Sequence, residues 1–434
     1  MKPTLQFFSL SALVLVLGLT GPAAADTVKG RIKSLSNKAG TIQLDVKDKP
    51  PVVVRFDAST VVEGASGIAD LNPPDLIQVE FTPGQPASKI KKVVFGLPPG
   101  VEIDIQELLA VLQGQRGPYL LGDARPVKRY EEGHIPSAVP TPAVKDGELL
   151  AKLPADKNQL LVFYCGGPTC PFTKKAYEIA TKAGYTNVKG FQAGIPGWNR
   201  AKLPIHANRA WLAGNLNEHL VLLDVRDPGV ASARHLPTAV GMPTAQLQAM
   251  TQAFIRDQTL ARLPGVSDTR SPIVLYADTQ VDRDVLLAYR ELRSWGYTNV
   301  GIMEGGLQDW TADGLPTVSG ALATTITYTK ALPPGAIGPQ EFMALVAQPA
   351  ETVFLDVRSN AEIAKQGALK GSVHIPLDQL AGRLADLPKD KEVITYCENG
   401  IRAEMAYETL RSNGFKARFL NETTNFDAAG DIKL

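Results

Sequence analysis

Apolar and polar residues alternate in short runs over residues 26–97. Stretches such as TVKGRIKSLS, GTIQLDV and DLIQVEF repeat with a period of two, and Gly, Pro, Asn and Asp separate them. This period is typical of half-buried β-strands. We expect about five short strands that form a small closed or half-closed β-barrel with an OB-like arrangement. Phe56 and Phe81 do not make a stacking array for bases, so the pattern favours an interaction or spacer module.

From residue 100 onward, continuous apolar runs alternate with stretches of helical periodicity. The runs LLVFY from Leu160, PIVLY from Pro272 and EVITY from Glu392 are typical of strands buried on both faces. Stretches such as AYEIATKAG space their apolar residues as a helix does. Alternating strands and helices predict an α/β fold with a central parallel sheet.

This strand, loop and helix pattern occurs three times. A Tyr ends the apolar run at 164, 276 and 396, which gives steps of 112 and 120 residues. A second shared piece lies upstream, as YLLGDARP, VLLDVRDP and VFLDVRSN. Because repeats of this length are whole domains, we predict three tandem domains. Their predicted ranges are residues 100–205, 206–317 and 333–434.

Composition and the N-terminal segment narrow the classes of protein. The chain has 434 residues and a formal net charge of +1, which leaves no basic surplus for binding nucleic acid. Its one long apolar run, Leu10–Leu19, is about half the length that spans a bilayer. We interpret residues 1–25 as a signal peptide and place the mature N-terminus at Asp26. The expected location is the periplasm, without a membrane span.

Three cysteines, Cys165, Cys170 and Cys397, are too few for a disulfide framework. Cys165 and Cys397 each follow directly after the apolar run of their repeat, where ligands bind in open α/β sheets. In the second repeat this position is Ala277. Because a glycine-containing loop and a helix start follow each cysteine, backbone N–H groups there should favour a thiolate. No Cys and His spacing has the regularity of a zinc site.

The DVR strand end, the GHIPSA turn, the YC loop with its helix, and the GG-x-x-W segment together resemble rhodanese, the sulfurtransferase domain. The resemblance covers nearly all of residues 100–434 as three copies. It implies α/β domains with a central parallel sheet. It further implies an active cysteine that takes sulfane sulfur from a donor such as thiosulfate and holds it as a persulfide. A thiol or cyanide accepts that sulfur, and no metal or organic cofactor is implied.

The third repeat has the loop most similar to the six-residue cradle of this family. The family's cradle ends in Arg, as this loop does, and the resemblance implies that it binds an anion. Its glycine lets the backbone turn inward, and its arginine offers a fork to an oxyanion. The loop consists of Cys397, Glu398, Asn399, Gly400, Ile401 and Arg402. The repeat departs from the family at its end, where FLNETTNFDAAGDIKL replaces EGGLQDW, and this puts its C-terminal packing in question.

The first repeat has a longer loop, CGGPTCPFTK. Its cysteine precedes the helical Tyr by 12 residues, against 10 in the third repeat. Gly166 and Gly167 permit close backbone approach, and Lys174 is a candidate cation of the anion-binding loop. Arg125 is a second candidate near the loop, but it is better interpreted as structural, because a matching Arg survives in the repeat without a cysteine. Cys170 is either a resolving thiol for an adduct on Cys165 or a small buried packing residue.

We expect the second repeat to be catalytically silent, because it lacks the cysteine and adds the carboxylates Asp278 and Asp282. The predicted function is an exported sulfurtransferase, with Cys165 as the leading nucleophile and Cys397 as the second. The donor would be a small sulfur-containing anion or a related chalcogen oxyanion, and the acceptor a thiol or a thiol protein. Selenite, arsenate or a phosphoester stay open as substrates. The alternative is a non-enzymatic scaffold or sulfur carrier for an exported redox complex.

Overall fold

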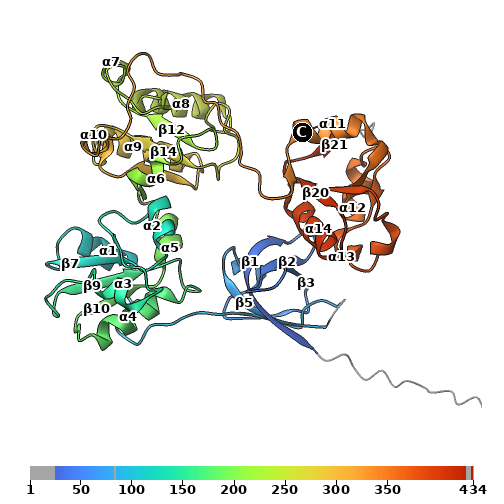
Figure 1. The fold of residues 1–434 in the computed structure, drawn as a ribbon, viewed down its shortest axis with the longest axis horizontal. Coiled ribbons are helices and arrows are strands. Elements are labelled where there is room, and N and C mark those ends of the chain that lie inside the picture. Colours follow the sequence, from blue (N-terminus) through green and yellow to red (C-terminus); the bar gives the residue numbers. More distant parts are fainter. Residues whose placement is uncertain (1–24, 83–84, 427–431, 434) are drawn as a thin grey trace, which may run out of the picture. The chain divides into compact units, whose positions relative to one another are not determined.

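The computed structural model describes residues 25–82, 85–426 and 432–433 (Figure 1). The predicted signal peptide, residues 1–25, lies outside these residues except for its last position. The chain forms two compact units. One contains the residues up to Lys92 together with Pro339 onward, and the other runs from Val93 to Gly338. Within the described residues, no helix is both long and apolar enough to cross a membrane.

The N-terminal part of the first unit, here called the β-domain, contains one six-stranded sheet with the strand order β3-β2-β1-β5-β6-β4. The strands are β1 (Asp26–Ser36), β2 (Thr41–Asp45), β3 (Val52–Arg55), β4 (Val61–Glu63), β5 (Leu76–Phe81) and β6 (Lys89–Lys92). All neighbours are antiparallel except β4 and β6. Ile32, Ile42, Val54 and Ile77 belong to its buried core. A small β-domain is therefore confirmed, whereas barrel closure and the OB-like arrangement stay predictions.

The third α/β domain, which belongs to the same unit, has β20, β19, β17 and β18 side by side in that order, all parallel. Its elements are α11 (Pro339–Ala347), β17 (Thr352–Asp356), α12 (Asn360–Gln366), β18 (Val373–His374), α13 (Leu377–Leu380), β19 (Glu392–Tyr396), α14 (Ile401–Ser412), β20 (Ala417–Leu420), β21 (Asn425–Phe426) and β22 (Ile432–Lys433).

The first α/β domain has the parallel strand order β10-β9-β7-β8. Its elements are α1 (Ile105–Leu112), β7 (Tyr119–Asp123), α2 (Val127–Glu132), β8 (Val139–Pro140), α3 (Asp146–Leu150), β9 (Leu160–Tyr164), α4 (Phe172–Lys182), β10 (Val188–Phe191) and α5 (Gly194–Arg200). Strand β9 is buried along its whole length, and alternate residues enter different cores. Val162 and Tyr164 enter one core, and Leu161 and Phe163 enter the other.

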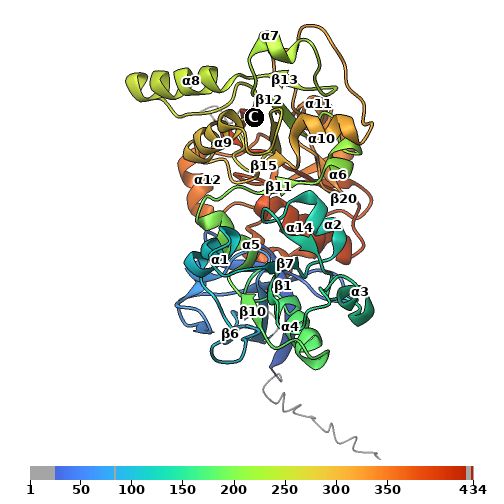
Figure 2. The same cartoon turned by 90° about the vertical axis from the view of Figure 1, so that its left-hand side faces the viewer.

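The second α/β domain has the strand order β11-β15-β14-β12-β13, again parallel. Its elements are β11 (His206–Ala207), α6 (Arg209–Ala213), β12 (Val221–Asp224), α7 (Pro228–Ala231), β13 (Val240–Gly241), α8 (Thr244–Asp257), β14 (Ile273–Tyr276), α9 (Arg283–Ser294), β15 (Val300–Met303) and α10 (Gly306–Ala312). Helix α8 protrudes from this domain (Figure 2).

The tyrosine that ends each central strand is buried, and its hydroxyl anchors the next turn. Tyr164 accepts a hydrogen bond from the Ile135 amide at 3.1 Å, and Tyr276 accepts one from Leu236 at 3.1 Å. The Tyr396 hydroxyl donates to Ser372 at 2.9 Å. A buried polar group needs such a partner, which explains why the pattern repeats. The predicted α/β class with central parallel sheets is confirmed in all three repeats.

Candidate active site

Cys165 lies directly after β9, at the carboxyl end of the central strand and before the loop that leads into α4. Its side chain is fully buried. The thiol donates weak hydrogen bonds to the carbonyls of Cys170 at 3.4 Å and Gly167 at 3.8 Å. Gly167 has φ +102°, a left-handed conformation that suits glycine. The predicted position of this cysteine at the strand end is therefore what the structure shows.

The surroundings of Cys165 are apolar. It belongs to the same buried cluster as Phe163, Ala176 and Ala180. Burial raises the pKa of its thiol, the neighbouring Cys170 raises it further, and hydrogen bonding from Thr173 opposes this only in part. Burial in this conformation therefore opposes the easily ionised thiol expected at Cys165, and that expectation stays a prediction. Desolvation of the thiolate outweighs the favourable dipoles at the helix start.

Cys170 lies in the same cluster, with 8% of its surface exposed. A Cβ placed on Gly166 would lie 3.9 Å from the Cys170 sulfur, so the loop folds back over the first cysteine. Cys165 and Cys170 are not joined by a disulfide. Lys174 lies half-buried in the first turn of α4. The two roles expected for Cys170, resolving thiol and packing residue, both fit this placement.

Each α/β domain contains the same ion pair between an aspartate and the arginine two residues after it in the chain. The guanidinium Nη2 lies 2.6 Å from the carboxylate in each of the pairs Asp123–Arg125, Asp224–Arg226 and Asp356–Arg358. Each arginine also donates to a backbone carbonyl eight or nine residues further along. Arg125 makes the same ion pair as its match in the second repeat, its charge also interacts with Cys165, and its structural role stays a prediction.

Cys397 follows β19 in the same way, and it is fully buried. Gly400 caps the N-terminus of α14 with φ +84°. A Cβ at this position would lie 3.0 Å from Asn421 Oδ1, so glycine is needed both for the turn and for the close approach. Asn399 Oδ1 lies 3.9 Å from the Cys397 sulfur and accepts a hydrogen bond from the Ile401 amide at 3.3 Å.

Arg402 differs from its predicted role. Its guanidinium, 3% exposed, makes a two-pronged ion pair with Glu362, with both nitrogen–oxygen distances at 2.7 Å. The two guanidinium nitrogens that were expected to bind an oxyanion therefore bind a carboxylate instead. Glu362 belongs to the capping box that starts α12 with Ser359. Hydrogen bonds from Arg402 hold the pKa of Glu362 well below its usual range, despite its partial burial.

The Cys397 site is polar. Burial lowers the pKa of Arg402, but hydrogen bonding to Glu362 and the charges at Cys397 and Glu398 outweigh it, so the pKa is raised. Glu398 Oε2 lies 3.8 Å from Arg402. Glu398 and the pair of Arg402 with Glu362 therefore form a charged cluster at the Cys397 loop.

The atypical end of the third repeat replaces a helix with a short hairpin. Strands β21 and β22 pair there, and Phe426 packs on Tyr396 and over the Arg358 guanidinium. The Thr424 hydroxyl donates to the Cys397 carbonyl at 2.7 Å. In the other repeats, the start of α5 or α10 binds the corresponding carbonyl through a backbone amide. The atypical sequence therefore keeps a hydrogen bond to the carbonyl of the cysteine, with a side-chain hydroxyl as the donor.

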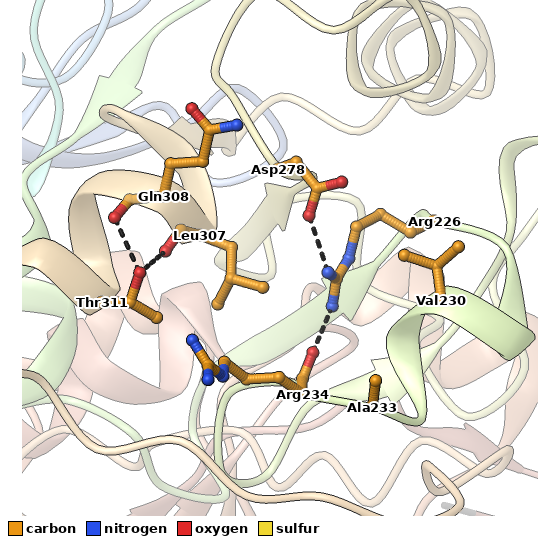
Figure 3. A pocket seen from close by; sticks show the side chains of 8 residues that line it. All are labelled: Arg226, Val230, Ala233, Arg234, Asp278, Leu307, Gln308 and Thr311. Atoms are coloured by element: carbon orange, nitrogen blue, oxygen red, sulfur yellow. Dashed lines mark hydrogen bonds and ion pairs between the residues drawn. The ribbon is translucent and has the colours of Figure 1, made fainter.

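The loop of the second repeat has Ala277 at the cysteine position and binds its own carboxylates. Asp278 pairs with Arg226 Nη1 at 2.8 Å, and Asp282 accepts hydrogen bonds from the amide and hydroxyl of Thr279. A cavity of about 370 Å³ lies beside Asp278 (Figure 3). Because Arg226 pairs with Asp278, that carboxylate repels an anion less than the sequence suggests, whereas Asp282 accepts from neutral donors and keeps its charge.

Each repeat has a histidine at a matching position, and its ring binds a backbone carbonyl next to a turn. His134 and His235 contact the carbonyl four residues earlier through Nδ1, at 3.0 and 3.1 Å, and His374 contacts the Arg358 carbonyl at 2.8 Å. Among the residues that the structure describes, no cluster of three or more His, Cys, Asp or Glu side chains could hold a metal ion.

Glu362 and Thr424, which no motif in the sequence singles out as residues of the site, contact the Cys397 loop. Glu362 lies 40 residues before Arg402, and Thr424 lies in the atypical tail. The spacing S-x-x-E at Ser359–Glu362 predicts a helix cap but not a charged partner for a distant arginine.

Comparison with known proteins assigns the family. The family model described as the rhodanese-like domain matches residues 105–201, 208–313 and 338–423. A protein named sulfurtransferase from Allochromatium vinosum is 33% identical over 76 residues, which cover 18% of this chain and 69% of that protein. An HTH-type transcriptional regulator of Mycobacterium tuberculosis is 36% identical over 91 residues, or 21% of this chain, and the match spans only 39% of the regulator's length.

Among solved structures, thiosulfate sulfurtransferase from Pseudomonas aeruginosa aligns over 76% of this chain and 66% of its own, with 21% identity and a TM-score of 0.26. The family-model matches cover more than half of the chain and coincide with the three α/β domains. The chain therefore belongs to the rhodanese-like domain family, with three copies of that domain in tandem.

Proposed function

We propose that this protein is a sulfurtransferase that moves sulfane sulfur from thiosulfate, polysulfide or a related chalcogen oxyanion to a thiol acceptor. The sulfur would travel as a persulfide on Cys397 or Cys165. The observation that carries the proposal is the equal placement of these two thiols at the carboxyl end of the central strand, before a helix start. The first amides of a helix have no helical partner and favour an anion there.

The proposed step at Cys397 is a displacement at sulfur. The thiolate attacks the outer sulfur of thiosulfate, a new sulfur–sulfur bond forms, and sulfite leaves with the electron pair of the broken bond. The thiolate of the acceptor then attacks the outer sulfur of the persulfide and regenerates the Cys397 thiolate. Within this step, Gly400 and Asn399 shape the loop, and Glu362 fixes Arg402 beside the thiol.

The two thiols should differ in their readiness to react. An arginine charge interacts with each thiol, Arg402 with Cys397 and Arg125 with Cys165, but burial and Cys170 raise the pKa of the Cys165 thiol. Since the thiolate is the nucleophile, we expect Cys397 to take up sulfur first at neutral pH. Both thiols are fully buried, so each loop must open before a donor can reach the sulfur.

We further propose that Cys170 resolves the adduct on Cys165, because the loop holds the two residues together in one cluster. The Cys170 thiolate attacks the inner sulfur of the Cys165 persulfide, a disulfide forms, and hydrosulfide leaves. A dithiol reductant must then restore the two thiols. A Cys170→Ser variant should retain the persulfide on Cys165, and wild type should release hydrosulfide and lose two hydrogens in mass.

The proposal places the protein in the periplasm, with a thiol protein or an exported redox partner as acceptor. It rests on the apolar segment Leu10–Leu19 and the small residues before Asp26. N-terminal sequencing of protein recovered from a periplasmic extract should begin at Asp26. Recovery of the uncleaved chain from the cytoplasm alone would contradict this part.

The test of the function is intact-mass spectrometry of wild type, Cys165→Ser and Cys397→Ser after incubation with thiosulfate. We expect a gain of one sulfur in wild type that is lost in the variant lacking the working cysteine. The sulfur should leave again on addition of a thiol. No gain in any sample, with all thiols reduced, would contradict sulfur transfer from thiosulfate and favour a scaffold role.

A further inference from the structure

The β-domain packs against the third α/β domain within one compact unit. Lys33 on β1 pairs with two glutamates of α14, Glu404 at 2.9 Å and Glu408 at 3.1 Å. The buried Thr41 hydroxyl donates to the sulfur of Met405 on the same helix, at 3.4 Å. Helix α14 begins directly after the Cys397 loop, so these contacts bring the β-domain to that loop.

The turn between β1 and β2 carries Lys38 onto the Cys397 loop itself. Its ammonium group pairs with Glu398, the residue that follows the cysteine. It also lies 3.8 Å from Oε1 of Glu362, the carboxylate that holds Arg402. A residue more than 300 positions away in the sequence therefore contacts both carboxylates of the site.

The charges around Cys397 balance only when Lys38 is counted. Glu362 and Glu398 supply two negative charges, and Arg402 supplies one positive charge in the same cluster. Lys38 supplies the second positive charge. Without Lys38, the loop would carry a net negative charge. This charge would repel a dianionic donor and would disfavour the thiolate form of the cysteine.

We propose that Lys38 is a positioning residue of the Cys397 site, through which the β-domain balances the carboxylates of the loop and admits an anionic sulfur donor. This inference rests on the proposed function at Cys397. The Lys38 side chain is 57% exposed, so its ion pair contributes little to stability. Lys38 instead changes the local charge at the Cys397 loop, and this charge acts on any charged reagent that approaches the thiol.

The experiment compares reagents of similar size and different charge on the full chain. Iodoacetate and iodoacetamide alkylate thiols, and peptide mass spectrometry gives the rate at Cys397 alone. Wild type is compared with Lys38→Gln and with Lys38→Arg, which keeps the charge. Lys89→Gln is the matched control, because it removes a lysine charge from the same domain whose partner, Glu63, lies within the β-domain. Thiosulfate loading of Cys397 is measured in parallel.

We expect Lys38→Gln to lower the ratio of iodoacetate to iodoacetamide rates about three-fold, which is the effect of one nearby charge in a solvated site. Thiosulfate loading should slow in the same variant. Lys38→Arg and Lys89→Gln should keep the wild-type ratio, and about 1 M salt should remove the difference.

An unchanged ratio in Lys38→Gln, with Cys397 reactive in wild type, would overturn the inference and leave the proposed function intact. A ratio lowered equally by Lys89→Gln would also overturn it, because the effect would then be one of overall charge. A Cys397 thiol that neither alkylating reagent nor thiosulfate modifies in wild type would instead contradict the proposed sulfur transfer at Cys397, and would overturn the inference with it.

Discussion

The loops of Cys165 and Cys397 occupy the same position in two copies of one domain, yet their neighbouring side chains differ. Cys165 lies among apolar side chains, next to a second thiol, and burial raises its pKa. Cys397 has Glu398, Asn399 and Arg402 around it. Position in the fold therefore provides the helix start, and the neighbours decide how readily the thiol ionises.

The largest expected effect on stability concerns the aspartate–arginine ion pairs. Arg358 is 1% exposed with its partner Asp356 at 0%, whereas the Arg125 side chain is 13% exposed. Arg358→Met should destabilise the third domain by about 3–5 kcal/mol, because Asp356 would stay buried without a cation. Arg125→Met should cost its domain less. Hydrogen exchange of β17 and β7 measures each domain separately, and equal losses would contradict this difference in burial.

The next effect concerns the backbone behind Cys165. Gly194 has φ +55°, and a Cβ there would lie 2.3 Å from the Cys165 carbonyl oxygen. Gly194→Ala should cost about 2–3 kcal/mol, more than left-handed strain alone. Gly184→Ala is the control, since Gly184 has φ +89° with open space around it, and it should cost about 1 kcal/mol. Hydrogen exchange of β9 measures both, and a Gly194→Ala cost no larger than the control would refute the close contact.

A smaller effect is expected at the partner of Arg402. Glu362→Gln should cost about 1–3 kcal/mol near neutral pH, because it leaves a buried guanidinium with a weaker acceptor. The pKa of Glu362 is lowered by folding, so its stabilisation is complete above the pKa of an unfolded glutamate, about 4.3, and is lost as the pH falls toward the folded value. Denaturation of the third domain across acidic pH should therefore be less pH-dependent in Glu362→Gln. An unchanged pH dependence would contradict the pair.

The smallest effect concerns the contact of the β-domain with α14. Lys33 and its glutamates are 30% and 20% exposed, so Lys33→Gln should cost the third domain about 0.5 kcal/mol. The mutation should increase hydrogen exchange at α14 and leave the second domain unchanged. An effect confined to the β-domain would argue against this contact.

Most of the fold could be predicted from the sequence, because it depends on local patterns. The period-two runs before residue 97 and the apolar runs ending in Tyr164, Tyr276 and Tyr396 became strands, and the three repeats became three parallel sheets. The expected position of Cys165 and Cys397 at strand ends also follows from the repeat, since the preceding strands are buried and parallel.

The chemistry of the site could be predicted less well, because it depends on residues far apart in the sequence. The fork of Arg402 binds Glu362, which no spacing connects to the loop, and Lys38 comes from another domain. Thr424 replaces a helix amide behind Cys397 in a tail that no longer has the family pattern. The burial of Cys165 could not be predicted for a similar reason, since the apolar cluster around it forms only on folding.

The central claim is that the polar surroundings of Cys397, and not the shared position in the repeat, make it the sulfur-accepting thiol at neutral pH. The most direct measurement is a time course of thiosulfate loading on the full chain with Cys170→Ser, which retains any persulfide on Cys165, with persulfides located by peptide mass spectrometry at Cys165 and Cys397 over a range of pH. We predict that Cys397 loads first near pH 7 and that Cys165 gains on it only as the pH rises. Faster loading of Cys165 near pH 7 would contradict the account.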